Sequence, residues 1–285
     1  MEPPTTPELN CESGSALSAE PAPAPTPPTP APKHKSGAWE TTRSLLVILV
    51  CVFGIRIFIG EATVIPTGSM EDTILIGDHV FLDKLPYGPR VPYTSVRLPE
   101  LKTIRPGDIV AFPYPRNPSV MYVKRVIGVG GDVIRVVDEQ VYRDGKKLNE
   151  PYAVNNRPGF DAWADDFPPP PGDIDEMAER WGADPDWARD LPKYVYPDGI
   201  HVPRGYLFVM GDNRDNSFDS RFWGFVPARS VVGEPLFVYW SYRAPSSEWM
   251  EESLEGRLRF DGSILKNFVR NTRWSRIGKI FENPN

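Results

Sequence analysis

The run "SLLVILVCVFGIRIFIG", from Ser44 to Gly60, constrains the fold of this chain more than any other segment. Arg56 is its single charged residue, and its length of about 17 residues is the lower limit for a helix that crosses a membrane. A buried core helix and a cleaved signal peptide are the alternatives, but signal peptides occupy the first ~15–30 residues and end at a small-residue cleavage site. We therefore predict an uncleaved membrane anchor, with its flanks, over residues 38–62.

The residues on either side of this run predict its direction across the membrane. Lys33, Lys35 and Arg43 precede it, whereas Glu61 follows it. Because positively charged flanks stay in the cytoplasm, we expect a cytoplasmic N-terminus and an extracytoplasmic body, in a bacterial-type cytoplasmic membrane. Residues 1–37 are rich in proline and alanine and have few apolar residues for a core, which predicts a disordered cytoplasmic tail.

The body of the chain, residues 63–285, alternates short β-branched or aromatic runs with Gly-Asp, Gly-Gly and Pro-Gly turns. This pattern predicts a mainly β, antiparallel fold. "VIRVVDEQVYRDGKKL" predicts a hairpin with Asp144-Gly145 at its second turn. The acidic, proline-rich stretch at about 158–200 interrupts the strands, and we interpret it as an inserted, solvated lobe with one helix near residues 175–181.

Composition narrows the range of functions. The formal net charge of −6 argues against a nucleic-acid-binding protein, which usually carries a basic domain. Cys11 lies in the tail and Cys51 in the apolar run, so we expect neither a disulfide nor a metal cluster. The C-terminal segment "ILKNFVRNTRWSRIGKIF" mixes cations with apolar residues, and it fits a basic helix at a membrane surface as well as an element packed on the domain.

A candidate nucleophile follows the apolar run closely. In "VIPTGSMEDT", Ser69 lies on a short turn and has no histidine beside it. A serine nucleophile needs a base within hydrogen-bond reach. His34 lies in the tail, and neither His79 nor His201 has a clear triad setting, so a Ser-His-Asp site has weak support.

Lysine is the alternative base, provided that burial lowers its pKa from ~10.4 by several units. Lys124 lies in "MYVKRVIGV", inside a β-branched run. Because Lys124 and Arg125 are adjacent on a strand, they point to opposite faces. We expect one of the two to point to solvent and the other to be paired or deprotonated, and two edge-strand surface charges remain an alternative on this segment alone.

A third segment, "GDNRDNSFDSRFWGFVP" (residues 211–227), combines turn-formers, charges and aromatic residues. Together with "IPTGSM", "YVKRVIG", "RPGDIVAF" and "EPLFVYWS", in this chain order, it closely resembles bacterial type I signal peptidases, which are membrane-anchored Ser/Lys endopeptidases. The resemblance extends from about residue 40 onward and is weak across the acidic stretch. It implies an antiparallel β catalytic domain with an inserted β-rich cap and one N-terminal transmembrane helix.

The resemblance also implies roles for individual residues. Ser69 would be the nucleophile and Lys124 the general base. The backbone N–H of Ser69 and the Thr67 hydroxyl, where serine is common in the family, would form the oxyanion hole. The supporting and substrate-binding positions that it implies are Ser217 to orient the lysine, the Asp219–Arg221 ion pair, the Asp212 carboxylate, and Ile65, Pro66 and Met70 against the substrate.

The implied activity is removal of signal peptides from secreted preproteins at the export machinery, after small residues at −1 and −3, without metal or cofactor. The chain departs from the family at Glu71-Asp72, where many members have a proline before the threonine. Self-cleaving Ser/Lys repressors are one rival, although they have a DNA-binding domain and no anchor. A catalytically altered relative that acts as an anchored binding module is the other rival.

Overall fold

The computed structural model describes residues 38–91, 94 and 96–281, and the predicted tail lies outside them. The chain forms two units, Met1–Leu46 and Val47–Asn285. The apolar run forms helix α1 (Ala38–Gly54), which continues as the π-helical η1 (Ile55–Ile59). Within the described part of the chain, Trp39–Ile59 is the one helix long and apolar enough to cross a membrane, with a mean hydropathy of 2.2 and none of it buried.

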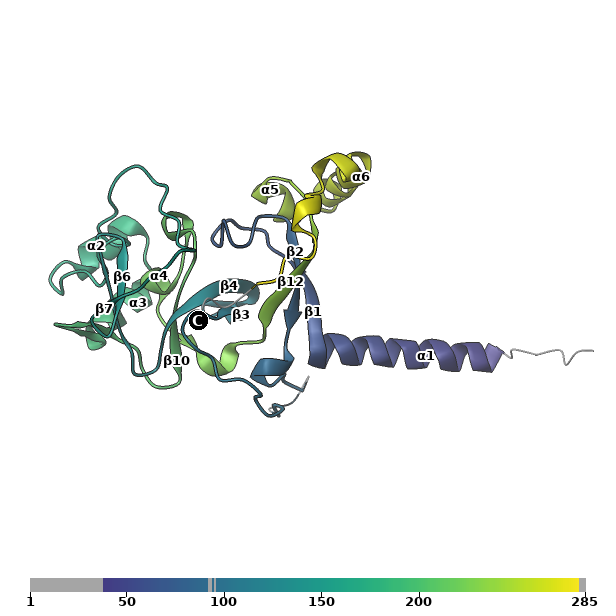
Figure 1. The fold of residues 1–285 in the computed structure, drawn as a ribbon, viewed down its shortest axis with the longest axis horizontal. Helices are drawn as coiled ribbons and strands as arrows, with labels where there is room; N and C mark the ends of the chain where they lie inside the picture. The colour runs from purple at the N-terminus through teal and green to yellow at the C-terminus, as the bar shows by residue number, and fades with distance from the viewer. Residues whose placement is uncertain (1–37, 92–93, 95, 282–285) are drawn as a thin grey trace, which may run out of the picture. The chain divides into compact units, whose positions relative to one another are not determined.

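The first sheet follows the apolar helix directly and has the strand order β1–β2–β12 (Figure 1). Its strands are β1 (Gly60–Val64), β2 (Asp78–Asp83) and β12 (Glu234–Ser241). Buried and half-buried residues alternate along β2, because successive side chains of a strand point to opposite faces. Val80 and Leu82 on the buried face pack with Met70 and Ile74, which come from the connection between β1 and β2.

The second sheet has the strand order β11–β10–β4–β3. Its strands are β3 (Ile109–Tyr114), β4 (Asn117–Val129), β10 (Tyr206–Met210) and β11 (Val226–Pro227). β4 is flanked on both sides, since Lys124 is opposite Val110 of β3 and Arg125 is opposite Met210 of β10. The Lys-Arg pair therefore lies on an internal strand and not at an edge of the sheet.

The third sheet has the order β7–β6–β5–β9–β8. Its strands are β5 (Val133–Val137), β6 (Gln140–Arg143), β7 (Lys146–Lys147), β8 (Val195–Tyr196) and β9 (Gly199–His201). The predicted hairpin is present, with Asp144 and Gly145 at positive φ in the turn between β6 and β7. All pairings between the named strands are antiparallel, which confirms the predicted fold class.

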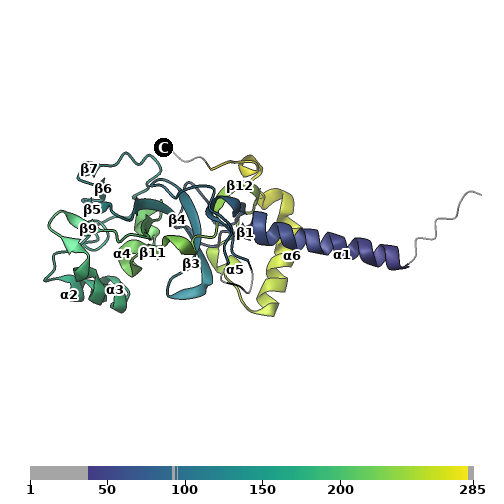
Figure 2. The ribbon, with the colours of Figure 1, turned by 90° about the horizontal axis from the view of Figure 1, so that it is seen from below.

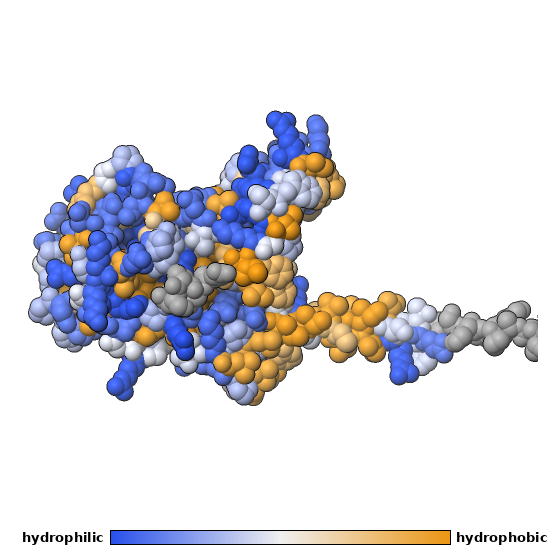
Figure 3. Space-filling model, in the orientation of Figure 1, coloured by the Kyte–Doolittle hydropathy of each residue, from blue (hydrophilic) through white to orange (hydrophobic). Residues whose placement is uncertain are grey.

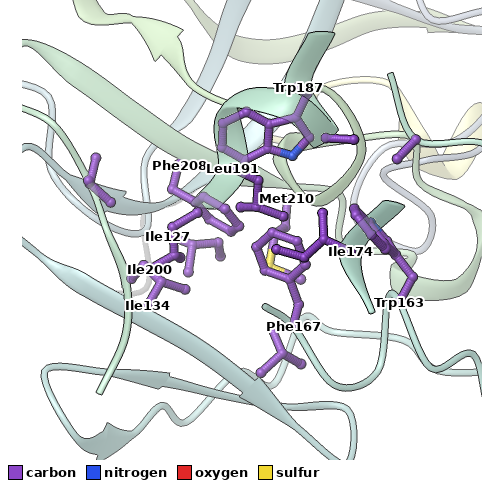
Figure 4. Close-up of a cluster of buried hydrophobic side chains, with 14 of the residues drawn as sticks. Ile127, Ile134, Trp163, Phe167, Ile174, Trp187, Leu191, Ile200, Phe208 and Met210 are labelled. Carbon is purple, nitrogen blue, oxygen red and sulfur yellow. The ribbon is translucent and has the colours of Figure 1, made fainter. Parts of the chain in front are cut away.

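The acidic stretch at 158–200 is a packed lobe, and our prediction of a solvated one was wrong. The expected helix forms as α2 (Ile174–Trp181), and a second helix, α3 (Pro185–Asp190), follows it and precedes η3 (Leu191–Lys193). Both helices lie beside the third sheet (Figures 1 and 2). Large side chains between the prolines fill one buried cluster with residues of the sheets (Figure 4), among them Trp163, Phe167, Ile174, Trp187 and Leu191.

The C-terminal segment of the described chain is helical. α5 (Ser246–Trp249) and α6 (Leu254–Asn271) follow β12, and η6 (Trp274–Arg276) comes after α6. No residue of α6 is buried. The remaining short helices are η2 (Leu85–Tyr87), η4 (Arg214–Asn216), α4 (Ser220–Trp223) and η5 (Ala228–Ser230).

Candidate active site

Ser69 lies in the connection between β1 and β2, and backbone hydrogen bonds fix this connection. The Glu71 N–H donates to the Gly68 carbonyl, and the Ile74 N–H donates to the Met70 carbonyl. Met70 and Ile74 anchor the turn in the core beneath it. Ser69 itself is 8% exposed, so its hydroxyl lies just under the surface.

The side chain of Lys124 meets that of Ser69. Lys124 Nζ lies 2.5 Å from Ser69 Oγ, although the two residues are 55 positions apart in the sequence. Lys124 comes from the internal strand β4 and is 4% exposed. Its Nζ also lies 5.2 Å from the centroid of the Tyr122 ring, on the same face of the strand. The structure therefore brings the expected nucleophile and base within hydrogen-bond distance.

Burial makes the charged form of Lys124 unfavourable. Loss of hydration is the largest cause that lowers its pKa, from 10.5 to about 8, and the nearby Arg221 guanidinium lowers it further. The carboxylates of Asp219 and Asp212 act in the opposite direction. The balance leaves an amine that loses its proton within reach of physiological pH.

Arg125 corrects our expectation that one of the two adjacent cations points to solvent, because both are buried. Arg125 Nε and Nη2 each donate to one oxygen of Asp212, both at 2.7 Å. Its Nη1 donates to the Gly107 carbonyl, and its guanidinium lies 3.8 Å from the centroid of the Tyr152 ring. A fully satisfied bidentate pair allows the arginine to be buried with its charge.

Asp219 and Arg221 form the expected ion pair behind the site. Arg221 Nε and Nη2 donate to the two oxygens of Asp219, both at 2.9 Å, and both side chains are almost fully buried. Burial favours the neutral acid, but the Arg221 charge and its hydrogen bonds outweigh this effect and lower the pKa of Asp219. The packed lobe holds the pair in place, since Trp163 Nε1 and Trp187 Nε1 both donate to the Arg221 carbonyl.

Ser217, which was expected to orient the lysine, instead forms hydrogen bonds with Gly211 and Asp219. Its Oγ accepts a hydrogen bond from the Gly211 N–H at 3.1 Å and bonds to Asp219. Among the described residues, no hydrogen bond joins Ser217 to Lys124. Gly211 lies in close contact with Ser69, because a Cβ at this position would collide with both the Ser69 carbonyl oxygen and the Ser217 hydroxyl.

Two further residues at the site, Asn213 and Gly211, escaped the sequence analysis, and the contact of Arg125 with Asp212 was not expected either. Asn213 connects the 211–227 segment to the turn around Ser69, which we call the nucleophile turn after its expected role. Its Nδ2 donates to the Gly68 carbonyl and its backbone N–H donates to the Ser69 carbonyl, both at 3.1 Å. Gly211 permits the close approach to the turn, and Arg125 holds Asp212, which also accepts from Thr73 Oγ1 at 2.5 Å. The density of polar residues in 211–217 was the available signal for the first two.

The other expected site residues divide by their exposure. Thr67 is exposed and Pro66 half-buried, so both lie where a substrate can reach them. Ile65 and Met70 are 5% and 1% exposed and belong to the core beneath the turn, which leaves Met70 no surface for a substrate in this structure. The Pro66 carbonyl accepts a hydrogen bond from Ser246 Oγ, which connects the turn to α5.

The histidines lie in other settings. His79 packs among Tyr239, Trp240 and Trp249, and burial lowers its pKa to about 4. His201 Nε2 hydrogen-bonds with Asp198 at 2.8 Å. In the described part of the chain, neither histidine makes a hydrogen bond to Ser69, and His34 lies outside that part.

One group of carboxylates, Glu139, Asp165 and Asp215, has oxygen atoms within 4.8 Å of one another, close enough to share a cation. Arg157 already supplies positive charge there, with Nη2 3.5 Å from Asp165 and 4.0 Å from Asp215. The Asp215 carboxylate also accepts from the Arg157 N–H at 2.6 Å. This group is accounted for as an ion-pair network.

Comparison with known proteins assigns the chain to a class of peptidases. Residues 38–240 match the family described as "Signal peptidase, peptidase S26". Signal peptidase I of Pseudomonas fluorescens is 34% identical over 72% of this chain and 74% of its own length, and that of Aquifex aeolicus is 32% identical over 82% and 95%. A solved signal peptidase I of Enterococcus faecalis is 29% identical and covers 47% of this chain and 97% of its own, with a TM-score of 0.29.

The family match includes the turn around Ser69, β4 and the 211–227 segment, which supply Ser69, Lys124 and the Asp219–Arg221 pair. The fold and these relatives place the chain among the serine endopeptidases. It belongs to the signal peptidase family, peptidase S26.

Proposed function

We propose that this chain removes signal peptides from secreted preproteins, with Ser69 as the nucleophile and Lys124 as the general base. The observation that carries the proposal is the 2.5 Å separation of Lys124 Nζ and Ser69 Oγ, together with the lowered pKa of the lysine. A base with a pKa near the working pH is effective, because it is both available unprotonated and able to take the proton.

The steps follow from this pair. The neutral Lys124 amine accepts the Ser69 proton while Oγ attacks the scissile carbonyl carbon and forms a tetrahedral intermediate. The protonated amine then donates this proton to the leaving nitrogen, the C–N bond breaks, and the mature protein leaves with a new amino terminus. A water molecule, deprotonated by the same amine, hydrolyses the ester between Ser69 and the signal peptide and restores the enzyme.

The developing oxyanion needs donors that are already in place. We assign the Ser69 N–H and the Thr67 hydroxyl, which is exposed at the surface of the turn. Losing one donor of this kind typically lowers turnover by about 10²–10³-fold. Asn213 positions the turn itself, because it donates hydrogen bonds to the carbonyls of Gly68 and Ser69, one on each side of the Ser69 Cα.

Asp219 and Arg221 support the lysine, Ser217 supports Asp219 by a hydrogen bond, and none of the three takes part in the chemistry. Arg221 contributes to the lowered pKa of Lys124, whereas Asp219 opposes it and also fixes Arg221. The packed lobe holds Arg221 by its carbonyl and by the hydrogen bond from Nη1 to the Ala164 carbonyl. The lobe therefore contributes to the position of the charges around Lys124.

Membrane attachment fits the substrate. Helix η1 ends at Ile59 and β1 begins at Gly60, so only a short stretch of chain separates the apolar helix from Ser69. We assign the N-terminal side to the cytoplasm and the catalytic domain to the extracytoplasmic side, with the preprotein's signal segment in the same bilayer. Cleavage would follow small residues at −1 and −3, which reach the turn near Ile65 and Pro66.

Cleavage of a preprotein by the purified full-length chain in detergent tests the proposal. We expect Ser69→Ala and Lys124→Ala each to abolish the new amino terminus found by sequencing the product, while the folded protein is retained. Lys146→Ala removes an exposed lysine from β7 and is the matched control, with wild-type cleavage expected. Substantial cleavage by Lys124→Ala would contradict the assignment of the base.

A further inference from the structure

A second concave site lies at the C-terminal end of the described chain. A cavity of about 580 Å³ opens between the loop after β12, the end of α6 and η6. Four arginines line it: Arg243, Arg270, Arg273 and Arg276. We call it the arginine pocket. Apart from Leu75, its lining residues lie beyond residue 240, where the match to the family model ends.

The arginine pocket has more positive than negative charge. Arg276 pairs with Asp78, whose carboxylate its Nη2 contacts at 2.5 Å. Arg273 Nη1 donates to the Ile76 carbonyl and the Ser241 hydroxyl, which carry no charge. Arg243 and Arg270 are exposed and form no ion pair among the described residues. The pKa of Arg273 is lowered, first by burial and then by repulsion from Arg243 and Arg276, although Asp78 opposes this.

Guanidinium groups that converge on a cavity are suited to a phosphate. Each guanidinium presents parallel N–H donors that match phosphate oxygens, and arginine keeps its charge because it does not lose its proton in proteins. Asp78 and Glu71 are the carboxylates that act on Arg273, so a phosphate in the arginine pocket would supply negative charge for the remaining arginines.

The surroundings of the arginine pocket favour a phosphate that belongs to a lipid. Trp274 lines the pocket and is 55% exposed, and Leu265 and Val269 on α6 are 81% and 73% exposed. Figure 3 shows apolar surface beside hydrophilic side chains in the region of α6, the yellow helix of Figure 1. Exposed tryptophan and aliphatic residues next to arginines are typical of surfaces that lie at a membrane interface.

We infer that the arginine pocket binds the phosphate of an anionic phospholipid, with the lipid's acyl chains against Trp274 and the exposed aliphatic residues of α6. The same chain has a helix long and apolar enough to cross a membrane, which favours a lipid as the source of the phosphate. Basic residues near a membrane attract anionic lipids. The inference does not depend on the proposed peptidase mechanism, because it concerns binding without a preprotein.

The choice of variants follows from the contacts in the arginine pocket. Arg276 Nη2 also donates to the Thr73 carbonyl at 3.0 Å, and Lys279 Nζ donates to the same atom at 3.3 Å. Changing Arg276 would therefore disturb the nucleophile turn. Arg243 and Arg270 have no such contact, so Arg243→Gln with Arg270→Gln removes charge from the pocket alone.

The experiment counts lipids retained by the full-length chain. Nanodiscs of phosphatidylcholine with phosphatidylglycerol are dissolved in mild detergent, and native mass spectrometry measures phosphatidylglycerol bound per protein. The matched control, Arg257→Gln with Arg259→Gln, removes equal charge from α6 outside the pocket. We expect one retained phosphatidylglycerol for the wild type and the control, and affinity about 30-fold lower for the pocket variant, at ~5-fold per arginine.

Equal retention by the pocket variant and the control would overturn the inference, as would equal retention of phosphatidylcholine by the wild type. Inorganic phosphate, added to the lipid-free protein in detergent, distinguishes a free ion from a lipid. Binding of inorganic phosphate without retention of phosphatidylglycerol would also overturn the assignment to a lipid. A Ser69→Ala variant should retain phosphatidylglycerol normally, so failure of this inference and failure of the peptidase assignment are separate outcomes.

Discussion

The candidate active site and the arginine pocket both contain cations that form no ion pair among the described residues, and the chemistry of the side chain decides the outcome. Lys124 is buried, and its amine responds by a fall of its pKa to about 8. The pocket arginines do not lose a proton, so Arg243 and Arg270 stay exposed to water and Arg276 takes Asp78 as its partner. Burial thus prepares a lysine for the proposed role of a base, whereas arginines in the same situation are suited to the proposed role of an anion site.

Arg125 completes the comparison, because it is the immediate neighbour of Lys124 and is equally buried. Its guanidinium does not lose its proton in proteins, and two hydrogen bonds to Asp212, at 2.7 Å each, satisfy the buried charge. Burial alone therefore does not determine the charge state on β4. The chemistry of the side chain does, because the same burial lowers the pKa of the Lys124 amine to about 8.

The largest expected effect comes from Lys124→Arg. This variant keeps the positive charge but removes the ability to lose it, so Ser69 has no base. We expect preprotein cleavage to fall by about 10²–10⁴-fold, the usual contribution of general base catalysis. Single-turnover cleavage measures the effect, and cleavage within a few-fold of the wild type would mean that the lysine acts only as a charge.

Asp212→Asn tests the ion pair that accompanies the burial of Arg125, because this variant leaves Arg125 buried without a charged partner. Removal of one member of a buried ion pair typically costs about 3–5 kcal/mol of folding stability. Urea unfolding of the full-length protein in detergent measures the loss of folding stability. Asp198→Asn, at an exposed ion pair with His201, is the control and should change stability little. Equal stability of the two variants would contradict the pairing.

The pH dependence of cleavage tests the proposed role of the Lys124 amine without any substitution. Because the neutral amine is the active form, the rate should rise about tenfold per pH unit below pH 8 and level off above it. The folded state binds fewer protons than the unfolded one between pH 8 and 10.5, so this group adds stability as the pH rises through that window. A rate that falls as the pH rises from 6 to 8 would contradict the scheme.

The smallest effect concerns the exposed arginines of the pocket. Arg243→Gln with Arg270→Gln removes two charges that form no ion pair among the described residues, so we expect stability within about 0.5 kcal/mol of the wild type. Thermal unfolding without anionic lipid measures it. A loss above ~2 kcal/mol would mean that these arginines hold the fold, and their excess charge would no longer need an anion to explain it.

The sequence predicted features that depend on local pattern. The apolar run predicted a helix of membrane-spanning length, the turn residues predicted the hairpin at Asp144-Gly145, and motif order predicted that Ser69 and Lys124 meet. The burial of Arg125 depends on Asp212, which is 87 residues away, and no pattern within β4 contains that information. This distance explains why one of the two cations was expected in solvent.

The lobe at 158–200 was misjudged for a different reason. Its core residues, such as Trp163, Phe167 and Trp187, are separated by prolines and acids without helical or strand periodicity, so they resemble a solvated loop. They are buried because other elements cover them, including Phe208 of β10. For the C-terminal segment the sequence left a basic helix at a membrane surface and an element packed on the domain equally open, and the structure forms α6, in which no residue is buried.

Direct titration of the Lys124 amine is the decisive measurement. The full-length protein in detergent, with lysine side chains labelled for NMR, gives the pKa of this group when its signal is assigned with Lys124→Arg. We predict a pKa of about 8. A value near 10.5 in the folded protein would contradict the role of Lys124 as a base for Ser69.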